Sequence, residues 1–368
     1  MHTYLLYPAS LLRAAERRCK ASVPAAVHEP ADWPPVHLLM AVHNEETVLP
    51  DKLRSIRRLA YPGPLTVHIA SDRSTDATDR QLREFTASYP AQLTFNPARR
   101  GKPGSINALA SALPRAGIFF FTDASVMLHP DTLTELVRAI VADPGVGVAD
   151  AVMQHTGVPG AGVGKLEDAY IRREVALKRA ESCLWKSMIG PFGGCWAMRA
   201  EAFRAVPENF LVDDFFLCMS AYEAGWRGVT APAARAREGV GVRLRDEFRR
   251  KRRIGAGNWQ NLVRFRGLWW PPGKSALHYA FFSHKVLRWL SPYLLLAGGL
   301  ATLGLIAYLG NYWSALAFLV MTVALCAVVP ALRYFSAMNA ALLLGGVDYL
   351  TGIKTNVWQP SHRNEQRD

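Results

Sequence analysis

The sequence has 368 residues, of which 50% are hydrophobic and 20% are charged, and its formal net charge is +13. Soluble globular proteins carry about 25% charged residues. Here the deficit is concentrated near the C-terminus, where 44 consecutive residues between Arg288 and Arg333 contain no Asp, Glu, Lys or Arg. About 20 apolar residues are enough to cross a bilayer, so we exclude a wholly soluble protein on composition.

Basic residues are spread along the chain, and their densest cluster is Arg249-Arg250-Lys251-Arg252-Arg253, upstream of the charge-free stretch. Basic residues near membrane spans gather on the cytoplasmic side, where they attract anionic lipid. We therefore expect a membrane partner and no nucleic-acid partner.

The five cysteines, Cys19, Cys183, Cys195, Cys218 and Cys326, form no Cys-x-x-Cys pair and no Cys/His pattern with metal spacing. An odd and scattered set favours free buried thiols in a reducing compartment.

Residues 1–35 are expected to form an amphipathic N-terminal segment and a linker. The apolar run 4–7 is too short to span a bilayer and no small-residue cleavage site follows it. Residues 1–20 are thus interpreted as an interfacial helix, or as the remainder of a longer hydrophobic N-terminus. Four prolines in residues 21–35 predict a stiff linker.

Residues 36–151 alternate short apolar runs with amphipathic stretches. The runs 36–42, 65–70 and 118–122 are predicted to be buried strands, with helical patterns at 103–113 and 130–142. Such alternation is typical of an α/β domain with a mostly parallel sheet, in which ligands bind beyond the carboxyl ends of the strands.

The polar part of the chain continues to about residue 270, and we take 36–270 as one catalytic domain. It is predicted to include a long helix at 165–185, a glycine-rich segment at 190–196, a helix opened by Asp213-Asp214 and the basic run 245–266.

The C-terminal part is predicted to be a membrane region at 291–353, preceded by an interfacial amphipathic helix at 271–290 and followed by a polar tail at 354–368. Two spans are expected at about 291–310 and 313–332, while 334–353 could be a third span or a re-entrant helix. Basic residues flank the outer ends of the hairpin and its turn has none. The positive-inside rule then predicts a multi-pass inner-membrane protein with a cytoplasmic catalytic domain.

Four polar turns follow apolar runs, and they could supply the chemistry: His43-Asn44-Glu45-Glu46, residues 71–78, Thr122-Asp123-Ala124-Ser125 and residues 212–215. Taken singly, Asn44 or Asp76 could simply cap a helix. Because all four turns follow strands or apolar runs of one predicted sheet, we expect their side chains to converge on one rim.

A nucleotide diphosphate with a metal ion would suit that rim. Asp72 could hydrogen-bond a ribose or a base, and Asp123 could bind a divalent cation, which prefers oxygen ligands. Lys102, in the run Arg99-Arg100-Gly101-Lys102, opens a helix that also carries Asn107, and supplies charge and free backbone N–H groups for a diphosphate. Asp214, or its neighbour Asp213, remains as a base to deprotonate an acceptor hydroxyl.

With these residues in order, the chain resembles membrane-anchored family 2 inverting glycosyltransferases with the GT-A fold. The resemblance extends from residue 36 to about 363, and its stretches are His43–Glu46, Asp72 with Ser74 and Asp76, Arg100-Gly101-Lys102 with Asn107, Asp123-Ala124-Ser125, Gly193-Gly194, Asp213-Asp214, and Arg252-Arg253 with Gly257. It implies a GT-A, Rossmann-like cytoplasmic domain followed by an interfacial helix and transmembrane helices.

The resemblance also implies roles for single residues. Asp214 is the expected general base, with Asp213 beside it, and Asp123 with Ser125 is expected to bind Mn or Mg on the diphosphate. The expected nucleotide-sugar residues are His43, Asn44, Glu45, Asp72, Lys102, Asn107, Asp123 and Arg253, and the expected acceptor residues are Phe192, Gly193, Gly194 and Cys195. The donor is expected to be a UDP-sugar.

The sequence departs from the family pattern in three ways. The metal motif Asp-x-Asp is reduced to Asp123-Ala124-Ser125, and the Gln-x-x-Arg-Trp motif of polymer-making members is replaced by Arg250-Lys251-Arg252-Arg253-Ile254. An N-terminal span is not evident. In polymer-making members, the Trp of this motif helps to stack a growing sugar chain. Because the present sequence lacks that Trp, we expect transfer of one sugar to a lipid-linked or membrane-proximal acceptor. The alternatives are a processive polysaccharide synthase and an inactive nucleotide-sugar or lipid-binding scaffold.

Other interpretations stay open for three features. The basic cluster could serve anionic lipid as well as a diphosphate, and Gly193-Gly194 could be a plain turn. Trp196, Trp259, Trp269 and Trp270 could be core or interfacial residues rather than sugar platforms.

Overall fold

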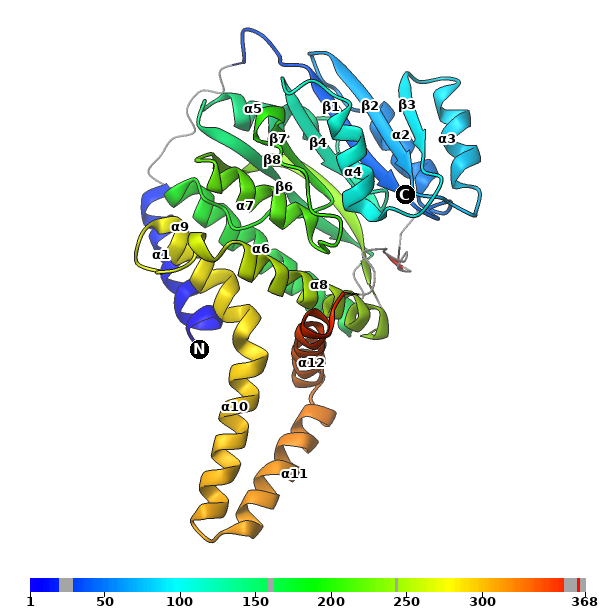
Figure 1. The fold of residues 1–368 in the computed structure, drawn as a ribbon. Coiled ribbons are helices and arrows are strands. Elements are labelled where there is room, and N and C mark those ends of the chain that lie inside the picture. The colour runs from blue at the N-terminus through cyan, green and yellow to red at the C-terminus, as the bar shows by residue number, and fades with distance from the viewer. Residues whose placement is uncertain (20–28, 158–161, 242–243, 354–362, 365–368) are drawn as a thin grey trace.

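The computed structural model describes residues 1–19, 29–157, 162–241, 244–353 and 363–364. A sheet in the order β3-β2-β1-β4-β7-β6-β8-β5, with β9 on β8, forms the centre of the polar part (Figure 1). The strands are β1 Val36–Val42, β2 Leu65–Ser71, β3 Ala91–Phe95, β4 Ile118–Thr122, β5 Val126–Leu128, β6 Val146–Thr156, β7 Cys195–Arg199, β8 Arg227–Gly241 and β9 Arg363–Asn364.

The sheet is mixed rather than mostly parallel. The strands β3, β2, β1 and β4 are parallel to one another, as the strand–helix alternation predicts. The strand β7 then runs antiparallel to both β4 and β6, and β5 runs antiparallel to β8. Hydrophobic periodicity finds a strand but does not give its direction, so the antiparallel half could not be predicted from it.

Buried side chains cover both faces of the sheet. This explains why the run of residues in β1 is continuously apolar. Leu38, Met40 and Val42 enter the core on one face, while Leu39 and Ala41 enter the core on the other. A strand buried on both faces has no polar alternation. The three predicted strands in this half therefore lie where expected.

The helices that pack on or beside the sheet follow the predicted ranges closely where the sequence predicts a range. They are α2 Leu49–Arg57, α3 Thr78–Thr86, α4 Gly101–Ser111, α5 Thr132–Val141, α6 Val163–Trp185, α7 Asp213–Glu223 and α8 Leu244–Arg264. The sequence predicts no range for α2 and α3. Short 3₁₀ turns occur at Ala200–Ala202 and Arg266–Leu268. The helix α7 begins at the predicted acidic pair, and α4 begins at Gly101.

The N-terminal helix packs on protein. A π-helical turn, His2–Leu6, continues into α1, Tyr7–Cys19, and Tyr7 and Leu11 are buried against α6 beside Leu177. Cys19 and Cys183 form a disulfide that joins α1 to α6, so the prediction of five free thiols is wrong for this pair. The two cysteines are 164 residues apart in sequence, and only the packing of the helices brings them together. The other three cysteines are free, and the linker prediction for 21–35 falls mostly outside the described residues.

The C-terminal helices are α9 Ala276–Phe281, α10 Leu287–Tyr308, α11 Tyr312–Val328 and α12 Pro330–Thr351, with a π-helical segment, Phe282–Val286, joining α9 to α10. Figure 1 shows α10 and α11 projecting from the domain as a hairpin, while α12 returns to α8. Ala276–Tyr308 is long and apolar enough to cross a membrane, and α11 with α12 is a pair bent by 103° that could be a second, broken span.

The structure differs in one respect from the prediction of an interfacial helix at 271–290. His284 is fully buried and Arg288 nearly so, because this segment packs against α6. Its charged side chains therefore meet protein carboxylates instead of lipid headgroups. Residues 334–353 also pack on protein, since most of them lie in α12, which contacts α8. They therefore do not form a straight third span.

Candidate active site

Asp72, directly after β2, lies at the N-terminus of α4. Its carboxylate accepts hydrogen bonds from the backbone N–H groups of Arg100 (2.7 Å) and Gly101 (3.0 Å), from Asn96 Nδ2 (3.0 Å) and from Arg99 Nε (3.0 Å). Burial alone would raise the pKa of Asp72, but these donors hold it below its usual value. Asp72 is fully buried and well supplied with donors, so it fixes the start of α4.

The turn after β1 is joined to the turn after β2. His43 Nδ1 lies 3.0 Å from the carbonyl oxygen of Asp72, and its other ring nitrogen contacts Arg99. Asn44 has a positive φ of 53°, which Asn tolerates better than most residues, and its Oδ1 accepts from the backbone N–H of Thr75 at 2.8 Å. The backbone N–H of Glu45 donates to Thr78 Oγ1 at 2.9 Å. His43, Asn44 and Glu45 are the residues predicted here to bind the nucleotide-sugar donor. Hydrogen bonds hold these three residues together, and we call them the donor rim.

Lys102, in the first turn of α4, brings together three segments. Its Nζ lies 2.7 Å from Asp123 Oδ1, 3.9 Å from Asp213 Oδ2 and 3.5 Å from the carbonyl oxygen of Gly193. Burial would lower the pKa of Lys102, but the three carboxylates Asp123, Asp213 and Asp214 raise it instead. We call these three carboxylates the acidic trio; Asp123 lies far in the sequence from the adjacent Asp213 and Asp214, which open α7.

The pKa of Asp214 is raised from its ordinary value. Burial, then the neighbouring Asp213, raises the pKa of Asp214 to about 6, although Lys102 opposes this. A carboxylate in this range can accept a proton near neutral pH.

The glycine pair lies against these carboxylates. A Cβ on Gly193 would be 2.6 Å from Asp214 Oδ2, and a Cβ on Gly194 would be 2.5 Å from Val126 Cγ2 and 3.6 Å from Asp123 Oδ2. Only glycine permits this approach without displacing a neighbour.

The members of the basic cluster on α8 point to different partners. Arg253 is exposed and interacts electrostatically with the acidic trio. Arg250 and Lys251 instead pair with Glu167 of α6, and Arg252 pairs with Asp348 of α12 at 2.6 Å. Arg250, Lys251 and Arg252 thus form ion pairs with carboxylates of the protein itself. Neither the lipid interpretation nor the diphosphate interpretation of the basic cluster included this role.

Several predicted residues have their side chains engaged outside the trio. Asn107 exchanges two hydrogen bonds with the backbone of Val206, at 2.7 and 2.9 Å, and so fixes a loop. Cys195 is fully buried in β7, where burial raises the pKa of its thiol. Phe192 donates its backbone N–H to Asp150 at 2.9 Å, and its ring lies under Lys178.

Lys52 and Glu238 are two neighbours of the predicted metal motif that the sequence reasoning missed. Ser125 Oγ donates to Glu238 Oε1 at 3.0 Å. Lys52, fully buried on α2, donates from Nζ to Thr122 Oγ1 and to the carbonyl oxygen of Val126, both at 2.5 Å. Burial lowers the pKa of Lys52 to about 7. A lysine on an amphipathic helix is ordinarily read as exposed, so the sequence carried no signal for this contact.

The acidic residues fit a metal ion that arrives with its substrate. Among the described residues, no group of three or more His, Cys, Asp or Glu side chains is arranged to hold a metal ion alone. A cation bound through one or two carboxylates and completed by substrate phosphates needs no such group. Asp123 meets that requirement, with Ser125 on the same turn and Glu238 of β8 hydrogen-bonded to Ser125.

A family model described as "Glycosyl transferase family 2" matches residues 38–206, which include the donor rim, Asp123 and the glycine pair but end before Asp213. The sequence has no significant match among curated proteins.

Among solved structures, the chain is similar to the mannosyltransferase PcManGT of Pyrobaculum calidifontis, in complex with GDP-Man and Mn²⁺. The identity is 25% and the TM-score 0.72, over 93% of this chain and 94% of that chain. A weaker likeness is to residues 1–349 of S. aureus TarS, with 16% identity and a TM-score of 0.43 over 86% of this chain and 91% of that chain. Another is to glucosyl-3-phosphoglycerate synthase of Mycobacterium tuberculosis, with 18% identity and a TM-score of 0.44 over 65% of this chain and 86% of that chain.

Proposed function

We propose a specific reaction from the premise that this chain is a glycosyltransferase (EC 2.4) with a family 2 domain at residues 38–206. It transfers a single sugar from a nucleotide sugar, with inversion, to a hydroxyl of a lipid-linked or membrane-proximal acceptor. The observation that carries the proposal is the contact of Lys102 with Asp123, Asp213 and Gly193, since it unites a cation for the diphosphate, a metal ligand and the acceptor turn.

Asp214 is the base in this proposal. As the acceptor oxygen forms its bond to the anomeric carbon, its proton passes to the Asp214 carboxylate. The bond from that carbon to the diphosphate oxygen breaks on the opposite face, and the nucleoside diphosphate leaves. Lys102 and Arg253 stabilise the negative charge that grows on the leaving group.

Asp123, with Ser125 beside it, would hold a divalent cation against the diphosphate. When bound, Mn or Mg neutralises phosphate charge as a Lewis acid. Asp72, His43, Asn44, Glu45 and Asn107 act on the donor indirectly, by fixing the turns and the helix that face it.

The donor nucleotide has two candidates. The sequence resemblance favours a UDP-sugar, whereas the extended structural match was solved with GDP-Man. The proposal that the acceptor lies in or near the membrane is supported by the apolar helix Ala276–Tyr308, which follows the domain directly. We propose that the domain faces the cytoplasm, on the positive-inside rule.

A transfer assay tests this function. Detergent-purified protein would be incubated with Mn²⁺, with radiolabelled GDP-mannose, UDP-glucose or UDP-N-acetylglucosamine, and with vesicles of extracted membrane lipid. We expect label from one donor to enter the lipid phase, with an inverted anomeric configuration by NMR. Label confined to free sugar with every donor, or a product of retained configuration, would contradict the proposal.

A further inference from the structure

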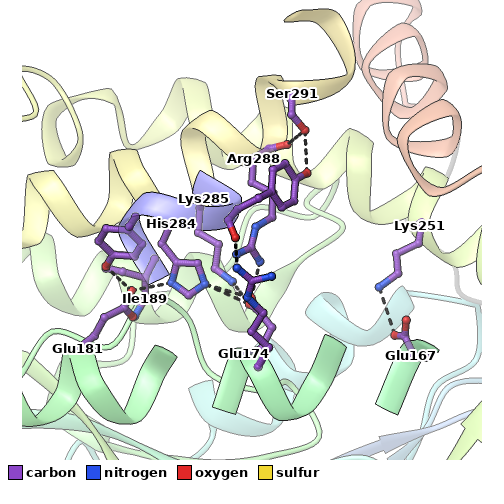
Figure 2. Close-up of polar contacts among 12 residues, drawn as sticks. Glu167, Glu174, Glu181, Ile189, Lys251, His284, Lys285, Arg288 and Ser291 are labelled. Carbon is purple, nitrogen blue, oxygen red and sulfur yellow. Dashed lines mark hydrogen bonds and ion pairs between the residues drawn. The ribbon is translucent and has the colours of Figure 1, made fainter. Parts of the chain in front are cut away.

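A cluster of buried charges lies between α6 and the segment that leads into α10 (Figure 2). Its carboxylates are Glu174 and Glu181 of α6, and its basic side chains are His284, Lys285 and Arg288. Glu181 and His284 are 0% exposed. Charges are rarely buried unless they are paired, and removing one partner leaves the other uncompensated. The reaction proposed above uses none of these residues.

Glu181 is the member that connects this cluster to the proposed site. Its Oε2 accepts the backbone N–H of Ile189 at 3.0 Å. Its Oε1 accepts the hydroxyl of Tyr7 at 2.7 Å and lies 2.7 Å from His284 Nδ1. One carboxylate therefore joins the N-terminal helix, the segment before α10 and the loop that begins at Ile189, as Figure 2 shows for its labelled members.

The loop from Ile189 to Gly194 ends at the glycine pair that lies against Asp214 and Asp123. Its second anchor is also a buried carboxylate: Asp150 accepts the backbone N–H of Phe192 at 2.9 Å and pairs with Lys178 of α6. The loop is thus held at two places, by Glu181 of α6 and by Asp150 of β6, which itself pairs with Lys178 of α6.

Glu174 and Glu181 differ in how they are compensated. Glu174 meets Arg288, Lys285 and His284, and although burial alone would raise its pKa, these basic side chains hold the pKa well below its usual value. Among the ion pairs of the described residues, the basic side chain that faces Glu181 is His284. Loss of His284 would therefore disturb Glu181, and with it Ile189, more than loss of Lys285 would.

We infer that His284 and Tyr7 are positioning residues for the loop Ile189–Gly194, and that they act through Glu181. Docking of the N-terminal helix and of the membrane-proximal segment onto α6 then sets the acceptor side of the site. That the loop faces the acceptor rests on the proposed function; that the loop is held through Glu181 does not.

Hydrogen–deuterium exchange on the full-length protein in detergent tests the inference. His284→Leu is expected to speed exchange of the Ile189 and Phe192 amides at least tenfold, and Tyr7→Phe, a milder change, about threefold. Exchange in the strand Val36–Val42 should stay unchanged. His284→Gln, which restores a donor toward Glu181, should recover most of the protection.

Lys285→Gln is the matched control, because it breaks a pair in the same cluster without touching Glu181. It should leave loop exchange at the wild-type rate. Unchanged loop exchange in both His284→Leu and Tyr7→Phe, or an equal increase in Lys285→Gln, would overturn the inference.

A functional readout separates this inference from the proposed function. In the transfer assay, His284→Leu should lower the transfer rate at least fivefold, with the nucleotide-sugar Kd unchanged. A weakened donor Kd would contradict positioning on the acceptor side. If wild-type protein transfers no sugar, the proposed function fails, while the exchange rates still decide whether the loop is held through Glu181.

Discussion

The proposed donor side and the proposed acceptor side of the site are assembled from contacts of very different range. On the donor side, Asp72 meets Arg99 and Asn44 meets Thr75 across 27 and 31 residues of sequence. On the acceptor side, Lys102 reaches Gly193 across 91 residues, His284 reaches Glu181 across 103, and Tyr7 reaches Glu181 across 174. The donor side is therefore built within one stretch of strand, turn and helix, whereas the acceptor side depends on helices from both ends of the chain. The following predictions ask whether the two sides can be damaged separately.

The largest separation is expected from Asp214→Asn. Without a base, turnover should fall by about 10²–10⁴-fold, because general-base catalysis contributes that much. The donor Kd should be unchanged, since the donor rim is intact. Steady-state kinetics with donor titration would measure both, and Asp51→Asn, at an exposed carboxylate of α2, is the control. Equal losses of turnover in the two variants would rule out Asp214 as the base.

Gly193→Ala should damage the acceptor side alone. A Cβ there would lie 2.6 Å from Asp214 Oδ2, and small displacements of a catalytic group cost up to about 10²-fold in rate. Gly267→Ala, at a glycine with no atom within 4 Å of the added Cβ, is the matched control and should be silent. Wild-type turnover in Gly193→Ala would show that the turn does not constrain Asp214.

Turnover should also depend on pH through Asp214. The group must be ionised to accept a proton, and its pKa is raised to about 6 by burial and by Asp213. The value of kcat/KM should therefore fall about tenfold for each pH unit below that point and level off above it. A pH-independent rate between pH 5 and 7 would contradict this assignment.

The smallest effect is expected on stability, from Lys52→Met. The folded pKa of Lys52 is about 7, below its value in an unfolded chain, so the unfolded state binds more protons in the window above pH 7. Wild-type stability should therefore rise between pH 7 and about pH 10 relative to Lys52→Met. Thermal unfolding at pH 7 and 9.5 would show it as a gain of a few degrees. A constant difference in Tm would indicate that Lys52 does not titrate in this window.

The contrast in range also explains what the sequence could predict. The strand Val36–Val42, the start of α4 beside Asp72 and the start of α7 at Asp213 are marked by local patterns, and the structure has all three. The meeting of the turns after β1 and β2 follows from the parallel half of the sheet, and Lys102 also joins Asp123 to Asp213. That these turns form one binding rim stays a prediction.

What the sequence could not predict depends on packing between distant segments. The buried basic side chains Lys52 and His284 looked like solvated or interfacial residues, because burial of a polar side chain is decided by partners that lie elsewhere in the chain. The disulfide between Cys19 and Cys183 and the antiparallel strand β7 were missed for the same reason. Glu238 meets Ser125 only because β8 pairs with β5.

The most direct test of the central claim is a titration of nucleotide sugars into the detergent-purified protein, with Mn²⁺ and again with a chelator. We predict that one donor among GDP- and UDP-sugars binds in a metal-dependent way, and that Asp123→Ala weakens its binding by about 10- to 100-fold. If no donor binds, or if binding is unchanged by both the chelator and Asp123→Ala, the account of the site as a metal-assisted donor site is contradicted.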